Sequence, residues 1–158
     1  MVGLRPRGGM VRRSRPDSGM IERLLGPRRM SGVTHPCPCC GYLQLDEQPG
    51  SHEICAICFW EDDAVQLRWP DWSGGANKPS LEVAQGHFEQ FGAVEERVLS
   101  HVRPVSGDDV RDAGWRAIDR SVDFFEPLGE QLAAWPDDLT VLYWWRPTFW
   151  RPGWSGQN

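Results

Sequence analysis

All five cysteines of this 158-residue chain fall within residues 37–58, which constrains the fold more than any other feature. Four of them form two pairs separated by 14 residues, Cys37-x2-Cys40 and Cys55-x2-Cys58. Two residues between thiolates allow a tight turn that aims both sulfurs at one ion, and the spacing is close to that of a four-cysteine zinc ribbon. We therefore predict one structural Zn²⁺ site whose ligands are Cys37, Cys40, Cys55 and Cys58.

Four thiolates fill the coordination shell of Zn²⁺, which leaves no position for a catalytic water. The site is therefore expected to stabilise the fold and not to carry chemistry. The fifth cysteine, Cys39, keeps two interpretations. It is either a small inert packing residue, or a thiol that reacts with oxidants or exchanges as an alternate ligand.

A β-hairpin is predicted between the two cysteine pairs. Residues 42–45 alternate in polarity as a strand does, residues 46–51 have turn composition, and residues 52–54 would return as the partner strand. Because an isolated hairpin is marginal in water, the metal would supply stability on the order of 10 kcal/mol.

Two short helices are expected after the second cysteine pair. The first would run from Ser80 as N-cap to Gly92, and the second over residues 94–102. Residues 139–145 have the strongest β propensity of the chain and predict a strand. The predicted fold class is a small α+β fold: a zinc-ribbon-like β-hairpin with two short helices and an aromatic-rich C-terminal extension containing one strand.

The chain divides into three segments by composition. Residues 1–33 are rich in Arg, Gly and Pro and are expected to form a disordered basic leader. One hypothesis is that translation starts at Met30; the alternative is an arginine-rich arm that binds nucleic acid or anionic surfaces. Residues 34–104 would form the zinc-binding domain, with residues 105–158 as an extension packed on it.

Charge argues against a nucleic-acid partner for the folded part. Residues 1–29 hold eight arginines and two acidic side chains, whereas residues 30–158 hold 9 basic and 20 acidic ones. Nucleic-acid binders usually present a basic face. The chain contains no run of 18 apolar residues, so no membrane span is predicted. Its cysteines are clustered and no export signal is recognised, which favours the cytoplasm.

Two further features each keep two interpretations. Glu61-Asp62-Asp63 could hold a divalent ion or act in acid–base catalysis, or could simply begin a short helix whose dipole favours anions.

Nine tryptophans are many for this length, and a C-terminal group of them would serve either as core or as a protein interface. The members of this group are Trp144, Trp145, Trp150 and Trp154.

Several stretches form one longer pattern: Cys37–Gly41, Pro49–Ser51, Glu53–Cys55, Cys58–Asp63, Val65–Arg68 and Gly74–Asn77. Together they resemble the bacterial cysteine-rich CPCC domain, over about residues 35–103. Residues 112–115 and 143–146 look like extensions found in some members. The resemblance implies a presumed zinc-binding domain of unknown function. It implies metal ligands only among the four paired cysteines, and it implies no enzymatic activity.

The sequence thus favours a non-catalytic, zinc-stabilised protein-interaction module of the bacterial cytoplasm. Its partner would be a protein, with a basic surface that suits the acidic folded part. One alternative is a zinc-ribbon nucleic-acid-binding or transcription accessory protein. It would need either that the basic leader is a real arm, or that four cations gather on one face: Arg68, Lys78, Arg97 and Arg103. The other is a thiol redox sensor that uses Cys39.

Overall fold

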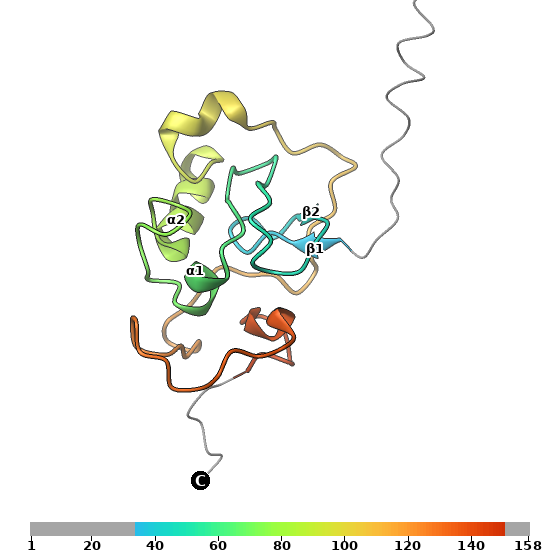
Figure 1. The fold of residues 1–158 in the computed structure, drawn as a ribbon. Coiled ribbons are helices and arrows are strands. Elements are labelled where there is room, and N and C mark those ends of the chain that lie inside the picture. Colours follow the sequence, from blue (N-terminus) through green and yellow to red (C-terminus); the bar gives the residue numbers. More distant parts are fainter. Residues whose placement is uncertain (1–33, 151–158) are drawn as a thin grey trace, which may run out of the picture. The chain divides into compact units, whose positions relative to one another are not determined.

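The computed structural model describes residues 34–150, so the basic leader and Trp154 lie outside the described residues. The regular elements are short and are joined by long irregular segments (Figure 1). Two strands pair, β1 (His35–Pro36) and β2 (Leu43–Leu45). The helices are α1 (Ala64–Arg68), α2 (Leu81–Phe91), and the 3₁₀ helices η2 (Glu96–His101) and η3 (Leu139–Leu142). A small fold with an antiparallel hairpin, few helices and a tight cysteine cluster is confirmed.

The hairpin uses a different partner strand from the predicted one. β2 pairs with β1, so the first cysteine pair lies in the turn between them. Residues 52–54 form no strand, and Ile54 makes a single isolated bridge to Glu61. The prediction for residues 52–54 was wrong because each cysteine pair reverses the chain and thereby supplies its own antiparallel neighbour. We call these turns the first knuckle (residues 37–42) and the second knuckle (residues 55–60).

Helix α2 begins and ends as predicted. The Ser80 hydroxyl accepts a hydrogen bond from the Val83 N–H at 3.3 Å, which satisfies one free donor of the first turn. Gly92 takes a left-handed conformation with φ 85°, and its N–H donates to the Phe88 carbonyl at 2.8 Å. Local capping chemistry was therefore sufficient to locate this helix.

The second predicted helix, residues 94–102, is instead the 3₁₀ helix η2. Its flanks are hydrogen-bonded to the second knuckle: the Val94 N–H donates to the Cys58 carbonyl at 2.9 Å, and the Arg103 N–H to the Ala56 carbonyl at 3.1 Å. A 3₁₀ helix rises about 2.0 Å per residue against about 1.5 Å in an α-helix, so it spans a fixed gap with fewer residues. The tertiary attachments at both ends therefore override the α-helical pattern.

The strand predicted over residues 139–145 is also wrong, because this segment begins with η3. The Asp138 carboxylate accepts the Thr140 N–H at 2.9 Å and caps the turn. The Val141 carbonyl accepts the Trp150 N–H at 2.9 Å, so the chain folds back on itself. β propensity measures how well side chains suit a half-buried pleated surface, and here Leu142 and Tyr143 are buried without any strand.

The core is built around the cysteines. The thiols pack with aliphatic and aromatic side chains from every part of the described chain: Ile57, Trp60, Leu67, Leu81, Ala84, Val98, Leu142, Tyr143 and Trp144. The C-terminal extension also bonds to the first knuckle, since the Asp112 N–H donates to the Gly41 carbonyl at 2.9 Å. Among residues 34–150, no helix combines the length and apolar character that crossing a membrane requires.

Candidate metal centre

The first knuckle is a tight turn closed by two backbone hydrogen bonds. The Cys37 N–H donates to the Tyr42 carbonyl at 2.9 Å, and the Gly41 N–H donates back to the Cys37 carbonyl at 2.7 Å. Gly41 has φ 80°, a left-handed conformation that glycine adopts without steric cost. The turn aims the side chains of Cys37 and Cys40 to the same side.

The second knuckle repeats the same backbone pattern. The Cys55 N–H donates to the Trp60 carbonyl at 2.9 Å, and the Phe59 N–H donates to the Cys55 carbonyl at 2.9 Å. Phe59 takes the position equivalent to Gly41 and has φ 71°, although it carries a side chain. Two turns with one geometry therefore present their thiols toward one another.

The four paired thiols meet in one cluster. Their sulfur atoms all lie within 4.8 Å of one another, and each residue is 0% exposed. The Sγ–Sγ distances are 3.6 Å between Cys37 and Cys58 and 3.7 Å between Cys40 and Cys55. A tetrahedral ion with metal–sulfur bonds of about 2.3 Å requires sulfurs about 3.8 Å apart. The four cysteines therefore fit a single tetrahedral metal ion.

Burial and hydrogen bonds among the thiols shift the pKa of three of the four cysteines, Cys37, Cys55 and Cys58. Burial raises the pKa of Cys37 and of Cys58, because a thiolate loses its hydration in the core. Hydrogen bonds from the thiols of Cys37, Cys40 and Cys58 lower the pKa of Cys55. These raised pKa values favour neutral thiols at Cys37 and Cys58, whereas a divalent cation bound there would favour all four thiolates.

Cys39 lies outside this set of four, yet it is also fully buried. Burial raises the pKa of its thiol. A cysteine that reacts with oxidants is usually exposed and has a lowered pKa. The structure therefore places Cys39 in the surroundings typical of a packing residue.

Side chains from distant segments hold the first knuckle, and sequence reasoning missed them. The Pro38 carbonyl accepts hydrogen bonds from Gln85 Nε2 at 3.0 Å and Trp115 Nε1 at 3.1 Å. The Arg111 Nε donates to the Cys40 carbonyl at 2.8 Å, and its guanidinium lies 4.2 Å from the Trp115 ring. The segment at residues 112–115, noted for its resemblance to extensions, was the only signal that pointed here.

The adjacent carboxylates of Glu61, Asp62 and Asp63 each bind a different partner. Asp62 Oδ2 accepts the N–H groups of Gly50 and Ser51 at 2.7 and 3.1 Å, and burial raises the pKa of Asp62. Asp63 Oδ1 caps α1, while Glu61 faces His52 with 3.1 Å between Oε1 and Nδ1. The helix-start interpretation is confirmed for Asp63. Within residues 34–150, the cysteine cluster is the only group suited to a metal ion.

The tryptophans of the C-terminal group that the structure describes are buried or half-buried. Trp144 belongs to the core, and its Nε1 donates to the Arg116 carbonyl at 3.2 Å. Trp145 is half-buried beside it, with ring centroids 4.6 Å apart. Trp150 covers the Arg68 guanidinium at 4.6 Å, and Trp154 lies outside the described residues. The core interpretation therefore applies to Trp144.

Comparison with known proteins gives one family. Residues 35–109 match the model of the family described as cysteine-rich CPCC. The match covers both knuckles, α1, α2 and η2, and it ends before η3. A search of curated proteins found no match. The resemblance inferred from the sequence is thereby confirmed.

Proposed function

Because residues 35–109 belong to the cysteine-rich CPCC family, we propose that the chain is a zinc-stabilised protein-interaction module without catalytic activity. The observation that carries this proposal is the buried cluster, in which each knuckle contributes two sulfurs at tetrahedral spacing. Zinc is the metal assigned, because four thiolates in a tetrahedron form its usual structural site.

The assigned ligands are Cys37, Cys40, Cys55 and Cys58. A bound Zn²⁺ would neutralise charge among these thiolates and add its binding free energy to the folding free energy. The absence of catalysis follows from the donor set: four protein ligands complete a tetrahedral shell and leave no open position for water or substrate. Such a protein would bind other molecules through its surface and not through its metal ion.

The arginines support a protein partner over nucleic acid. All seven arginines within residues 34–150 interact with other residues of the protein, and six of them form ion pairs with carboxylates. These six pairs are Arg68–Glu126, Arg97–Glu95, Arg103–Asp109, Arg116–Asp123, Arg120–Glu82 and Arg146–Asp112. Phosphate contacts need cations that are free to replace counterions. This pairing of the arginines supports a protein partner over nucleic acid.

The redox alternative has weaker support. A sensor thiol must meet the oxidant, whereas Cys39, within the first knuckle, is fully buried in the core. Packing is consequently the role that its surroundings favour.

The test compares two cysteine variants of the full chain, purified under reducing conditions. Cys55→Ser should abolish zinc binding and cooperative unfolding, because it removes one of four ligands. Cys39→Ser, the matched control, should keep one zinc per chain and a similar melting temperature. Metal content by elemental mass spectrometry and thermal unfolding by circular dichroism give the readout. Loss of zinc from Cys39→Ser, or a metal-free wild-type protein, would contradict the ligand assignment.

A further inference from the structure

One stretch of the C-terminal extension exposes large apolar side chains. The exposed fractions are 55% for Val122, 66% for Phe124, 55% for Leu128 and 56% for Leu132. We call these four residues, which are exposed within one stretch of the chain, the 122–132 face. Single exposed apolar residues are ordinary, but a concentration of them marks interaction sites in folded proteins.

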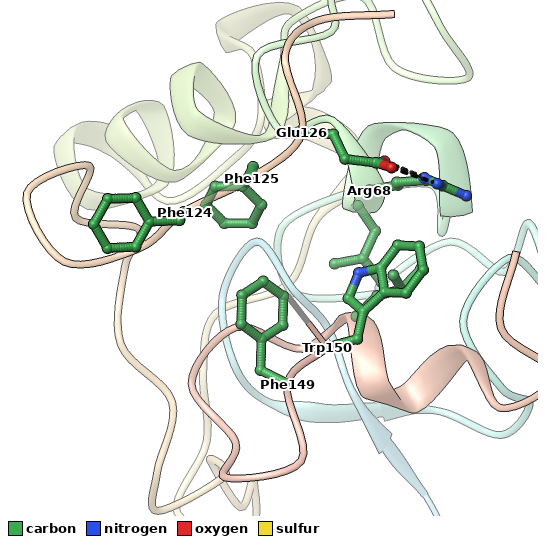
Figure 2. Close-up of a pocket in the computed structure, with 8 residues that line it drawn as sticks. Arg68, Phe124, Phe125, Glu126, Phe149 and Trp150 are labelled. Carbon is green, nitrogen blue, oxygen red and sulfur yellow. Dashed lines mark hydrogen bonds and ion pairs between the residues drawn. The ribbon is translucent and has the colours of Figure 1, made fainter. Parts of the chain in front are cut away.

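Glu126 anchors the segment that carries this face. Glu126 Oε1 accepts the N–H groups of Leu132 and Ala133 at 2.8 and 3.2 Å, which curls residues 126–133 into a closed loop. The same carboxylate pairs with the buried Arg68, at 2.7 Å from Nη2 to Oε1. Figure 2 shows Phe124 lying away from this ion pair, with Phe125 between them. Leu128 and Leu132 of the face thus lie on an anchored loop, and Val122 and Phe124 precede that loop in the chain.

The segment that carries the face is acidic. Residues 119–138 contain six acidic residues and one basic one, Arg120, which is engaged by Glu82. Four exposed carboxylates of this segment make no ion pair with any residue of 34–150: Asp119, Glu130, Asp137 and Asp138. A ligand for this surface must therefore supply both positive charge and apolar side chains.

We propose that the 122–132 face binds a segment of a partner protein that combines lysine or arginine with large apolar residues. The proposal rests on the protein-interaction function above and names the chemistry of the partner. The four carboxylates that make no ion pair would attract the positively charged segment from a distance. Contact with Phe124 and Leu132 would then supply most of the binding free energy by removing apolar surface from water.

The test uses the zinc-loaded full chain and a fluorescent peptide of about 18 residues, in which lysines and leucines form opposite faces of a helix. A second peptide keeps the lysines but replaces each leucine by serine. We expect fluorescence anisotropy to show binding of the first peptide at least about tenfold tighter than of the second. Added salt should weaken binding, because the free carboxylates contribute.

Variants locate the binding surface. Phe124→Ser and Leu132→Ser should each weaken binding of the lysine–leucine peptide by about tenfold or more. Val110→Ser is the matched control, since Val110 is 61% exposed and lies outside the face; its affinity should stay within about twofold of wild type. Glu130→Gln combined with Asp137→Asn should reduce both the affinity and its salt dependence.

Three results would overturn the proposal. Unchanged affinity in Phe124→Ser and Leu132→Ser would move binding to another surface and leave the protein-interaction function intact. Failure of both peptides to bind a correctly folded, zinc-loaded chain would remove the assigned ligand class. A dimer in light scattering that Phe124→Ser dissociates would assign the face to a second copy. Failure of the zinc module itself would appear separately, as missing metal in the wild-type chain.

Discussion

Two equivalent residues show what a turn demands of its sequence. Gly41 and Phe59 occupy equivalent positions in the two knuckles, with φ 80° and 71°, yet only one of them is glycine. A positive φ costs a residue with a side chain about 1–3 kcal/mol, so it does not by itself require glycine. The difference lies in the neighbours, because a Cβ on Gly41 would lie 2.5 Å from the Trp115 ring. Close approach by the extension makes glycine necessary at the first knuckle.

Gly41→Ala should therefore destabilise the protein by about 2–4 kcal/mol, because it adds backbone strain and a collision with Trp115. Urea unfolding at neutral pH measures the change. Gly86→Ala within α2 is the matched control, since a Cβ there meets nothing within 4 Å; it should stabilise by about 0.5–1 kcal/mol. Equal stability of Gly41→Ala and wild type would show that the Trp115 contact does not restrict the turn.

At the scale of elements, one buried ion pair joins α1 to the extension. Arg68, the last residue of α1, bonds to Glu126 and to the Ala133 carbonyl, the latter at 2.7 Å. Its guanidinium carbon lies 4.6–4.8 Å from three indole rings, those of Trp69, Trp135 and Trp150. Breaking such a pair leaves an uncompensated charge in the core. Arg68 was considered only as a surface cation from sequence, because nothing local marks its distant partner.

This pair predicts a dependence of stability on pH. Burial acts to raise the pKa of Glu126, but hydrogen bonds from Arg68 and from the Leu132 and Ala133 amides outweigh it and lower this pKa. A lowered pKa in the folded state means that Glu126 stabilises the fold above its unfolded pKa of about 4.3. That contribution is lost as pH falls through the folded pKa.

Glu126→Gln should thus cost about 3–5 kcal/mol at pH 7, and the difference from wild type should shrink as the pH falls below about 4. Urea unfolding of both proteins across this range provides the measurement. Glu130→Gln, which changes an exposed glutamate of the same loop, should be neutral at every pH. A constant difference between wild type and Glu126→Gln down to pH 3 would refute the ionic contribution.

At the scale of the whole molecule, the thiol cluster is part of the buried core. The four thiols are surrounded by side chains from α1, α2, η2 and η3, among them Leu67, Leu81, Val98 and Leu142. The regular elements are too short to form a core by themselves, and the two-stranded sheet would be marginal alone. The fold therefore depends on whatever holds the two knuckles together.

Removal of zinc by a strong chelator under reducing conditions should accordingly unfold the described part of the chain. We expect loss of dispersion in amide NMR spectra and loss of the cooperative thermal transition, with recovery when zinc is added back. Magnesium serves as the control cation, because it prefers oxygen ligands and should not restore the fold. A chelated protein that still melts cooperatively would show that apolar packing alone maintains the core.

Local chemistry was sufficient for some features. Cysteine spacing predicted which four thiols come together, because a knuckle needs only a few consecutive residues to form. Ser80 and Gly92 predicted both ends of α2, since capping bonds are made within one turn. The strand partner of β2 and the strand at residues 139–145 were mispredicted, because pairing and burial depend on segments far away in the sequence.

The order of residues by itself therefore determined the cysteine cluster, the capped helix and the excess of acidic charge, all of which follow from short-range spacing or composition. Only the tertiary structure decided that Arg68 is buried against Glu126, that Trp144 fills the core, and that Phe124 remains exposed. The physical reason is burial: whether a charge is neutralised or an aromatic ring is covered depends on which distant segments pack against it.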